Sequence, residues 1–203
     1  MDLLPQDKDS KILEIGCGAG QLLYYLKVSG YKDIEGADIG EEQVKLLESM
    51  RINGTVIDSV QEYLKGKRDY YDLIIMNQVI EHFPKSELWN NLSAIYKSLK
   101  KEGIFIFITP NMSCLSGLSQ RYTDFTHEIG FTERSASQVM RISGFRDIVV
   151  KGDKIILKLR IGRLFWWLTN LIWHSVLGFI YYVEKGMDRP RILSRHLIVT
   201  GKK

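Results

Sequence analysis

The sequence predicts an α/β fold in which a mostly parallel sheet is covered by helices on both faces. Short apolar segments alternate with amphipathic ones through the first 110 residues, and this order is typical of β-α-β units. The short segments are almost continuously apolar, as expected for strands buried on both faces. A chain of 203 residues that is 45% hydrophobic suffices for one such domain but not for two. We therefore expect a single domain over residues 1–203.

Each element follows from its local sequence. Strands are expected where aliphatic and β-branched residues cluster, at 11–17, 34–39, 55–58, 71–79, 103–109, 145–150 and 195–200. Helices are expected at 21–28, 41–50, 60–64, 86–99 and 135–143. The second helix begins with Glu41 and Glu42, as the helix dipole favours. Residues 110–132 are predicted to form a long loop, which in a compact domain is usually functional.

Charge and cysteine content limit the class of protein. The net charge is +4, but no run of five or more basic residues occurs, so we interpret it first as a solvated surface. A weak preference for an anionic partner is the second interpretation. Cys17 and Cys114 make no metal-binding pattern and suit a reducing compartment. Because the first ten residues lack the apolar core of a secretory signal, we expect a cytoplasmic protein, peripheral to the inner face of the membrane if it contacts lipid.

A glycine-rich turn connects the first predicted strand to the first predicted helix. The run EIGCGAGQ begins at Glu14 and carries glycines at 16, 18 and 20. Glycines let a backbone turn tightly and approach a ligand closely. In the dinucleotide fingerprint G-x-G-x-x-G, the third glycine would fall where Gln21 stands. This difference disfavours a nicotinamide oxidoreductase.

Polar residues follow the next three strands, at the edge where open α/β sheets bind ligands. A carboxylate at Asp38 can accept hydrogen bonds from both ribose hydroxyls, and Asp58 can meet an adenine edge. Either aspartate could instead cap the following helix. The coincidence of several groups favours an adenosine-containing cofactor. The expected cofactor-binding residues are Glu14, Gly16, Cys17, Gly18, Gly20, Asp38, Ile39, Asp58, Ser59, Asn77 and Gln78.

Three runs, EIGCGAGQ, GADI and NQVIEHF, resemble class I S-adenosylmethionine-dependent methyltransferases, in particular the ubiquinone-biosynthesis O-methyltransferase-like group. The resemblance covers about residues 10–150 and the last strand. It implies a Rossmann-like three-layer α-β-α sandwich with seven strands, the last antiparallel, and S-adenosyl-L-methionine as cofactor. It also implies that Glu14 and the glycines surround the methionine portion, with Asp38 on the ribose, Asp58 near the adenine and Asn77 on the sulfonium side.

The segment 121–132 (RYTDFTHEIGFT) is the most unusual stretch. With 109–111 it resembles methyltransferases encoded among bacterial surface-polysaccharide biosynthesis genes, and we expect it to lie over the sheet edge near Glu81. Methyl transfer to a hydroxyl needs alignment and removal of a proton, for which an oriented histidine is suited. We expect His127 as general base, Asp124 as the residue that orients it, and His82 as the alternative base.

Each histidine also has a structural interpretation. His82 could cap the turn after the fourth strand, and His127 could hold the loop by hydrogen bonds. A divalent metal bound by Glu81, His82, Asp124 and His127 is conceivable, but no spacing demands one. We therefore expect no metal.

Residues 164–183 carry no formal charge and contain three of the four tryptophans. Twenty residues could span a bilayer, but the last strand must return to the same sheet. On a helix, one stripe would collect the polar residues Arg163, Asn170, His174, Tyr181 and Lys185. We expect 161–186 to be an inserted apolar helical segment that lies in a membrane interface through 161–183. Burial against the domain or in a homodimer is the alternative.

These features favour O-methylation of a sugar or glycolipid hydroxyl in cell-surface polysaccharide biosynthesis, with a small-molecule or lipid-linked glycan as acceptor. The alternatives are methylation of an aromatic polyprenyl (quinone precursor) hydroxyl and a non-catalytic, cofactor-binding scaffold. No nucleic-acid partner is expected. Residues 77–80 (NQVI) stand where a D/N-P-P-Y/F motif would lie, and no basic stripe occurs.

Overall fold

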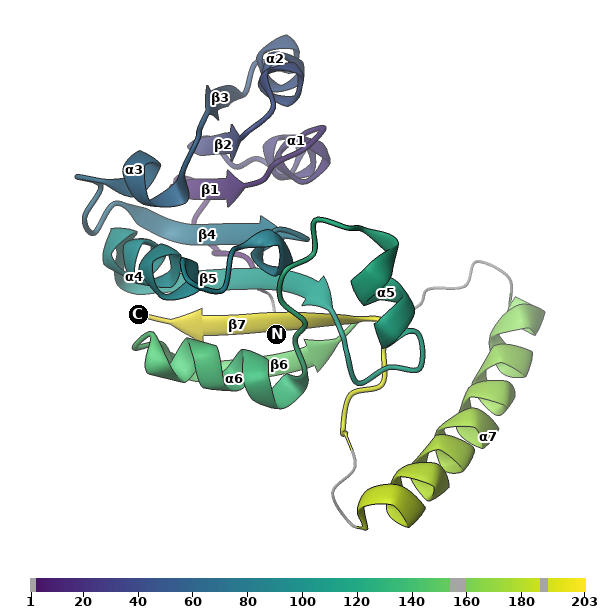
Figure 1. Ribbon diagram of the computed structural model, residues 1–203. Coiled ribbons are helices and arrows are strands. Elements are labelled where there is room, and N and C mark those ends of the chain that lie inside the picture. The colour runs from purple at the N-terminus through teal and green to yellow at the C-terminus, as the bar shows by residue number, and fades with distance from the viewer. Residues whose placement is uncertain (1–2, 154–159, 187–189) are drawn as a thin grey trace.

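A computed structural model describes residues 3–153, 160–186 and 190–203. Its strands are β1 (Ile12–Ile15), β2 (Ile34–Asp38), β3 (Asn53–Val56), β4 (Tyr71–Asn77), β5 (Leu99–Pro110), β6 (Arg146–Gly152) and β7 (His196–Lys202). They form a seven-stranded sheet in the order β3-β2-β1-β4-β5-β7-β6 (Figure 1). β7 runs antiparallel to both of its neighbours, and the other pairs are parallel. The expected Rossmann-like sheet with an antiparallel last strand is confirmed.

The helices are α1 (Gln21–Val28), α2 (Glu41–Ser49), α3 (Val60–Leu64), η1 (Ile80–His82, a 3-10 helix), α4 (Leu88–Ser98), α5 (Gly117–Thr123), α6 (Glu133–Ile142) and α7 (Arg160–Lys185). Most predicted elements overlap these closely, although β3 begins two residues before its predicted start and β5 four. The prediction of an uninterrupted loop over 110–132 was wrong, because α5 lies within it. This short helix buries only Gly117, so its sequence carries no apolar stripe that faces a core.

The core has two parts, one on each face of the sheet. Ile74 and Met76 of β4 pack in a cluster with residues of α3, α4 and α6. Leu73 and Ile75, which alternate with them along the strand, pack in a second cluster with residues of α1 and α2. Alternate residues of a strand point to opposite faces, so the continuous apolar run in β4 is explained by helices on both sides.

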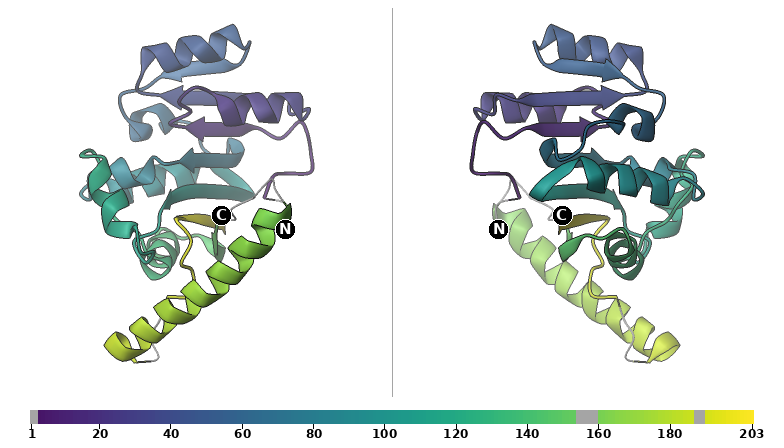
Figure 2. Two further views of the ribbon diagram at one scale, coloured as in Figure 1. Left: turned by 90° about the vertical axis from the view of Figure 1, so that its right-hand side faces the viewer. Right: turned by 90° about the vertical axis from the view of Figure 1, so that its left-hand side faces the viewer.

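α7 stands apart from the sheet, with its chain connections at β6 and β7 (Figures 1 and 2). Leu177 is buried, and the Tyr181 hydroxyl donates a hydrogen bond to the carbonyl of Ser113 at 3.1 Å. Among the residues that the structure describes, no helix has both the length and the apolar character needed to cross a membrane. Four members of the predicted polar stripe lie outside the described side chains: Arg163, Asn170, His174 and Lys185. The division into one domain with an insertion at 161–186 stays a prediction.

The glycine turn allows a direct test of its packing. Gly16 and Gly18 have φ angles of 70° and 51°, so alanine at either position is strained by about 1 to 2 kcal/mol. A Cβ on Gly16 would also overlap a methyl group of Val79, whereas one on Gly18 would meet nothing within 4 Å. Because overpacking adds about 1 to 3 kcal/mol, we expect Gly16→Ala to lower the free energy of unfolding by about 2 to 5 kcal/mol, and Gly18→Ala by the strain alone. Urea denaturation measures both, and equal losses would contradict the packing argument.

Candidate active site

The carboxyl ends of three neighbouring strands lie level, which brings the predicted cofactor residues to one edge. Ile15 of β1 pairs with the residue before Asp38 in β2 and with the residue before Asn77 in β4. Gly16, Asp38 and Asn77 therefore leave the sheet side by side. This juxtaposition was the central expectation from the sequence, and the register of the sheet produces it.

Asp38 connects the glycine turn to the start of α2. Its Oδ2 accepts a hydrogen bond from the Gly18 N–H at 2.8 Å, and its Oδ1 accepts one from the Gly40 N–H at 3.0 Å. It does not cap α2, because the N-cap residue is Gly40. Each carboxylate oxygen has a second lone pair, so both could still accept a ribose hydroxyl. That role stays a prediction.

Glu14 is a buried acid beside the glycine turn. Its side chain is 3% exposed, and its Oε2 finds no hydrogen-bond partner among the described residues. Burial, and then the negative charge of Asp38, raise the pKa of Glu14 to about 8. Burial, followed by the charges of Asp38 and Glu14, raises the pKa of the Cys17 thiol to about 12. Cys17 is thus a neutral thiol. A cation bound next to Glu14 would lower the pKa of its carboxyl group and favour the ionised form.

The remaining predicted cofactor residues lie at the same edge. Asp58 and Ser59 follow β3, where Ser59 is the N-cap of α3 but makes no side-chain capping hydrogen bond. Ile39 is exposed. Gln78 has a φ of 57° and donates its N–H to the Ile108 carbonyl at 2.9 Å. Left-handed backbone at a residue other than glycine is uncommon, and four further described residues of the chain share it away from this edge.

The segment 121–132 lies against η1, where the sequence placed it. The Glu81 carbonyl accepts hydrogen bonds from the N–H groups of Glu128 and Ile129, at 2.8 and 3.0 Å. The rings of His82 and His127 meet edge to face with centroids 4.8 Å apart. Two histidines separated by 45 residues in the chain thus share one site.

Hydrogen bonds determine the tautomer of both histidines. His127 Nδ1 lies 3.0 Å from the carbonyl of Gln120, which only accepts, so Nδ1 carries the proton. His82 Nδ1 lies 2.8 Å from the Thr126 hydroxyl, whose own proton goes to Asp124 at 2.6 Å. His82 Nδ1 must therefore donate as well. In the neutral form both rings keep an unprotonated Nε2, the atom that a base or a metal ligand uses.

The Asp124 carboxylate does not bind the His127 ring directly, although the Asp124 carbonyl accepts a hydrogen bond from the His127 N–H at 3.3 Å. That Asp124 orients His127 through the loop stays a prediction. The Asp124 Oδ1 accepts from both the hydroxyl and the N–H of Thr126, and these bonds, the side-chain one first, lower the pKa of Asp124. The carboxylate therefore acts on His82 through Thr126, while the Gln120 carbonyl holds His127. The sequence did not single out Gln120 or Thr126, because neither residue type by itself suggests a partner for a distant histidine.

Glu81 is the second buried acid of the site. Its side chain is 1% exposed; Oε2 accepts from the Thr109 hydroxyl at 3.1 Å, and Oε1 lacks a hydrogen-bond partner within the described part of the chain. Burial raises the pKa of Glu81 to about 7, although its backbone and Thr109 hydrogen bonds oppose this. The sequence suggested Glu81 only as a metal ligand. An acid directly before a histidine at a strand end was the available signal.

Glu81, His82 and His127 could hold a divalent cation. One ligand atom from each lies within 4.8 Å of the others, and two imidazoles with a carboxylate form a common donor set for such ions. The structure therefore gathers three of the four residues considered from the sequence, with Asp124 bound to Thr126 instead. The expectation that no metal is needed stays untested.

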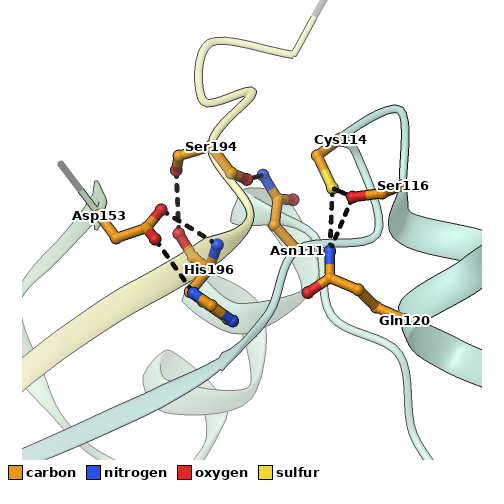
Figure 3. A network of polar contacts seen from close by, with 7 residues as sticks. All are labelled: Asn111, Cys114, Ser116, Gln120, Asp153, Ser194 and His196. Carbon is orange, nitrogen blue, oxygen red and sulfur yellow. Dashed lines mark hydrogen bonds and ion pairs between the residues drawn. The ribbon is translucent and has the colours of Figure 1, made fainter. Parts of the chain in front are cut away.

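Polar contacts hold the loop between β5 and α5 (Figure 3). The Asn111 amide donates to the carbonyls of Ile192 and Ser194, each at 2.9 Å. The Gln120 amide donates to the Cys114 sulfur at 3.2 Å. These contacts tie the helix that carries Gln120 to the chain entering β7, so the support of His127 depends on residues from both ends of the fold.

Known proteins share this architecture. Residues 1–150 match a family model described as a methyltransferase domain. A ubiquinone biosynthesis O-methyltransferase from Yersinia enterocolitica is 31% identical over 116 residues, which are 54% of this chain and 46% of that protein. A cyclopropane-fatty-acyl-phospholipid synthase from Escherichia coli is 27% identical over 99 residues, 49% of this chain and 26% of the synthase. The chain thus spans less than half the length of these curated relatives.

A solved structure agrees with the family match. The S-adenosylmethionine-dependent methyltransferase from Archaeoglobus fulgidus superposes with a TM-score of 0.73 at 25% identity, covering 96% of this chain and 86% of that one. The shared fold, together with the level strand ends and the glycine turn of this chain, agrees with the sequence match. The chain belongs to the methyltransferase domain family, as a class I, S-adenosylmethionine-dependent member.

Proposed function

We propose that the chain methylates a hydroxyl group of a sugar or glycolipid intermediate in cell-surface polysaccharide biosynthesis. The observation that carries the proposal is the pair His82 and His127, each anchored through Nδ1, which leaves Nε2 as the proton-accepting nitrogen of the neutral ring. A hydroxyl must lose its proton as it attacks, and a neutral imidazole accepts that proton near neutral pH. The resemblance of 121–132 to polysaccharide-cluster methyltransferases supports the acceptor class.

The residues divide between two tasks. S-adenosylmethionine, when bound, supplies an electrophilic methyl group on a sulfonium. The unpaired Oε2 of Glu14 would pair with its cationic amino group, and the Asp38 carboxylate would accept hydrogen bonds from its ribose hydroxyls. His127 takes the proton of the acceptor hydroxyl at Nε2, with His82 as the alternative base. Gln120 holds the imidazole of His127 in the required orientation.

An aromatic polyprenyl hydroxyl is the second candidate acceptor. The similarity to a ubiquinone biosynthesis O-methyltransferase favours it, and the same base would serve a phenol. A cofactor-binding scaffold without activity is the third possibility, since binding needs only the glycine turn and the strand ends. The identity of the methylated product separates all three.

Transfer of a labelled methyl group tests the function directly. We expect label from S-adenosylmethionine to appear in lipid-linked or free glycan as an alkali-stable methyl ether, because a hydroxyl is the group that a histidine base activates. Mass spectrometry of the product locates the methylated atom. Label confined to a polyprenyl phenol would establish the second candidate, and cofactor binding without transfer to either acceptor would establish the scaffold.

Proton release tests the place given to Glu14. With its pKa raised to about 8, the free carboxyl is mostly protonated at pH 7, and an adjacent cation favours the ionised form. Binding should therefore release about one proton near pH 7, and affinity should rise with pH until about 8 and then level off. Calorimetry in buffers of different ionisation enthalpy measures the release. Glu14→Gln should abolish the pH dependence; wild-type binding without proton release would contradict the pairing.

Substitution of His127, combined with metal chelation, separates acid–base catalysis from metal catalysis. We expect His127→Ala to lower kcat by about a hundredfold, the lower range for loss of a general base, with an unchanged Kd for the cofactor. Chelation with EDTA should leave wild-type turnover intact. The kcat of His82→Ala, measured in the same assay, shows which of the two histidines contributes more to proton transfer.

Two outcomes would alter this mechanism. Full turnover of His127→Ala would remove that residue from the proton transfer. Loss of activity in EDTA that Mg²⁺ or Mn²⁺ restores, together with an inactive Glu81→Gln, would instead assign the three side chains to a metal ion.

A further inference from the structure

α7 presents a broad apolar face away from the rest of the molecule. Leu177 and Tyr181, one turn apart, face the body, where Tyr181 binds the Ser113 carbonyl. Four apolar residues spaced 4, 7 and 4 apart occupy the other side of the helix, and all are exposed: Leu168, Ile172, Phe179 and Val183. Soluble monomers rarely leave a long apolar face without a partner.

The segment around α5 carries further exposed apolar side chains. This segment begins next to Ser113, the residue that α7 contacts. Its large side chains that face solvent are Leu115, Leu118, Tyr122 and Phe125. We call these residues, with the four of α7, the apolar docking surface.

Basic residues are concentrated in the part of the sequence that contains α7. Residues 151–195 contain nine Lys and Arg but three Asp and Glu, a net charge of +6, whereas the whole chain carries +4. The other residues are therefore net negative, by two charges. Within the described residues, Lys151, Arg191 and Arg195 of this segment are exposed. A second copy docked face to face would bring two such segments together, which like charges oppose, whereas an anionic bilayer attracts them.

We propose that the apolar docking surface binds an anionic lipid bilayer, with α7 lying in the plane of the interface. Aromatic and aliphatic side chains on one face, with basic residues nearby, are the features of an interfacial helix. Association does not require the helix to span the bilayer, so both of its ends stay on one side. The chain leaves the sheet and returns to it at one place: Asp153, just after β6, pairs with His196 at the start of β7 at 3.0 Å (Figure 3).

The docking surface and the acceptor site share α5. Gln120 on this helix accepts the hydrogen bond from His127, and the Arg121 guanidinium donates to the carbonyls of His127 and Glu128. Leu118 and Tyr122 of the same helix face solvent. A bilayer that contacts Leu118 and Tyr122 would therefore contact the same helix that holds His127. This deepens the proposed function, on which it rests, because it favours a hydroxyl acceptor carried on a lipid.

Vesicle flotation of the full chain tests the proposal. We expect recovery with phosphatidylcholine vesicles that contain phosphatidylglycerol, little with phosphatidylcholine alone, and release by high salt. The double variant Ile172→Ser, Phe179→Ser removes side chains that are 65% and 67% exposed, and should weaken partitioning by about tenfold. Leu118→Ser with Phe125→Ser should weaken it similarly.

A matched control uses exposed apolar residues elsewhere. Ile142 on α6 and Tyr25 on α1 are 61% and 58% exposed, and Ile142→Ser with Tyr25→Ser should float like the wild type. Absence of flotation, or equal loss in the control, would overturn the proposal. So would a dimer in sedimentation that the α7 variant breaks without any vesicle binding, since a second copy would then cover the face. Flotation needs no turnover: an active chain that stays unbound refutes only the docking, and a bound chain that methylates nothing refutes only the function.

Discussion

The parallel pairing of β1 with β2 and β4 is the constraint on which the rest of the site depends. Hydrogen bonds along these strands set their ends level, so three loops begin at one edge. Asp38 then connects two of those loops through the Gly18 and Gly40 N–H groups. A shift of one residue in either pair would turn its side chains to the opposite face of the sheet. The geometry of the cofactor cradle is therefore a consequence of sheet register rather than of any single loop.

Two buried acids each have a carboxylate oxygen that a ligand could bind. Glu14 and Glu81 each leave one carboxylate oxygen without a hydrogen bond among the described residues, and burial raises the pKa of both. Buried polar atoms without partners cost stability and are uncommon in folded proteins. Their positions, beside the glycine turn and beside the histidine pair, coincide with the two halves of the site that we propose for the cofactor and for the acceptor. A cation or a hydrogen-bond donor at each position would remove the cost.

α5 joins three parts of the molecule that are distant in sequence. Its Gln120 holds His127, the loop before it is bound through Asn111 to the chain entering β7, and Ser113 contacts α7. A displacement of α7 is thus linked through a few hydrogen bonds to the orientation of His127. Residues of this helix, α5, would contribute both to lipid binding and to acceptor binding.

The sequence by itself determined the strands, the glycine turn and the acids at the strand ends, because each depends on local spacing: a buried strand is a short apolar run, and a tight turn needs glycine. It also placed the segment 121–132 near Glu81. Only the tertiary structure decided the rest. α5 was not predicted because it buries almost nothing and so has no apolar stripe. The hydrogen bonds from Thr126 to Asp124 depend on the conformation of the segment, which its residue types do not reveal. The tautomer of His82 and the approach of His82 to His127 arise from contacts between segments more than 40 residues apart, whose relative placement depends on long-range packing that no local pattern encodes. The tautomer of His127 depends on the Gln120 carbonyl, which the turn after α5 brings to the ring.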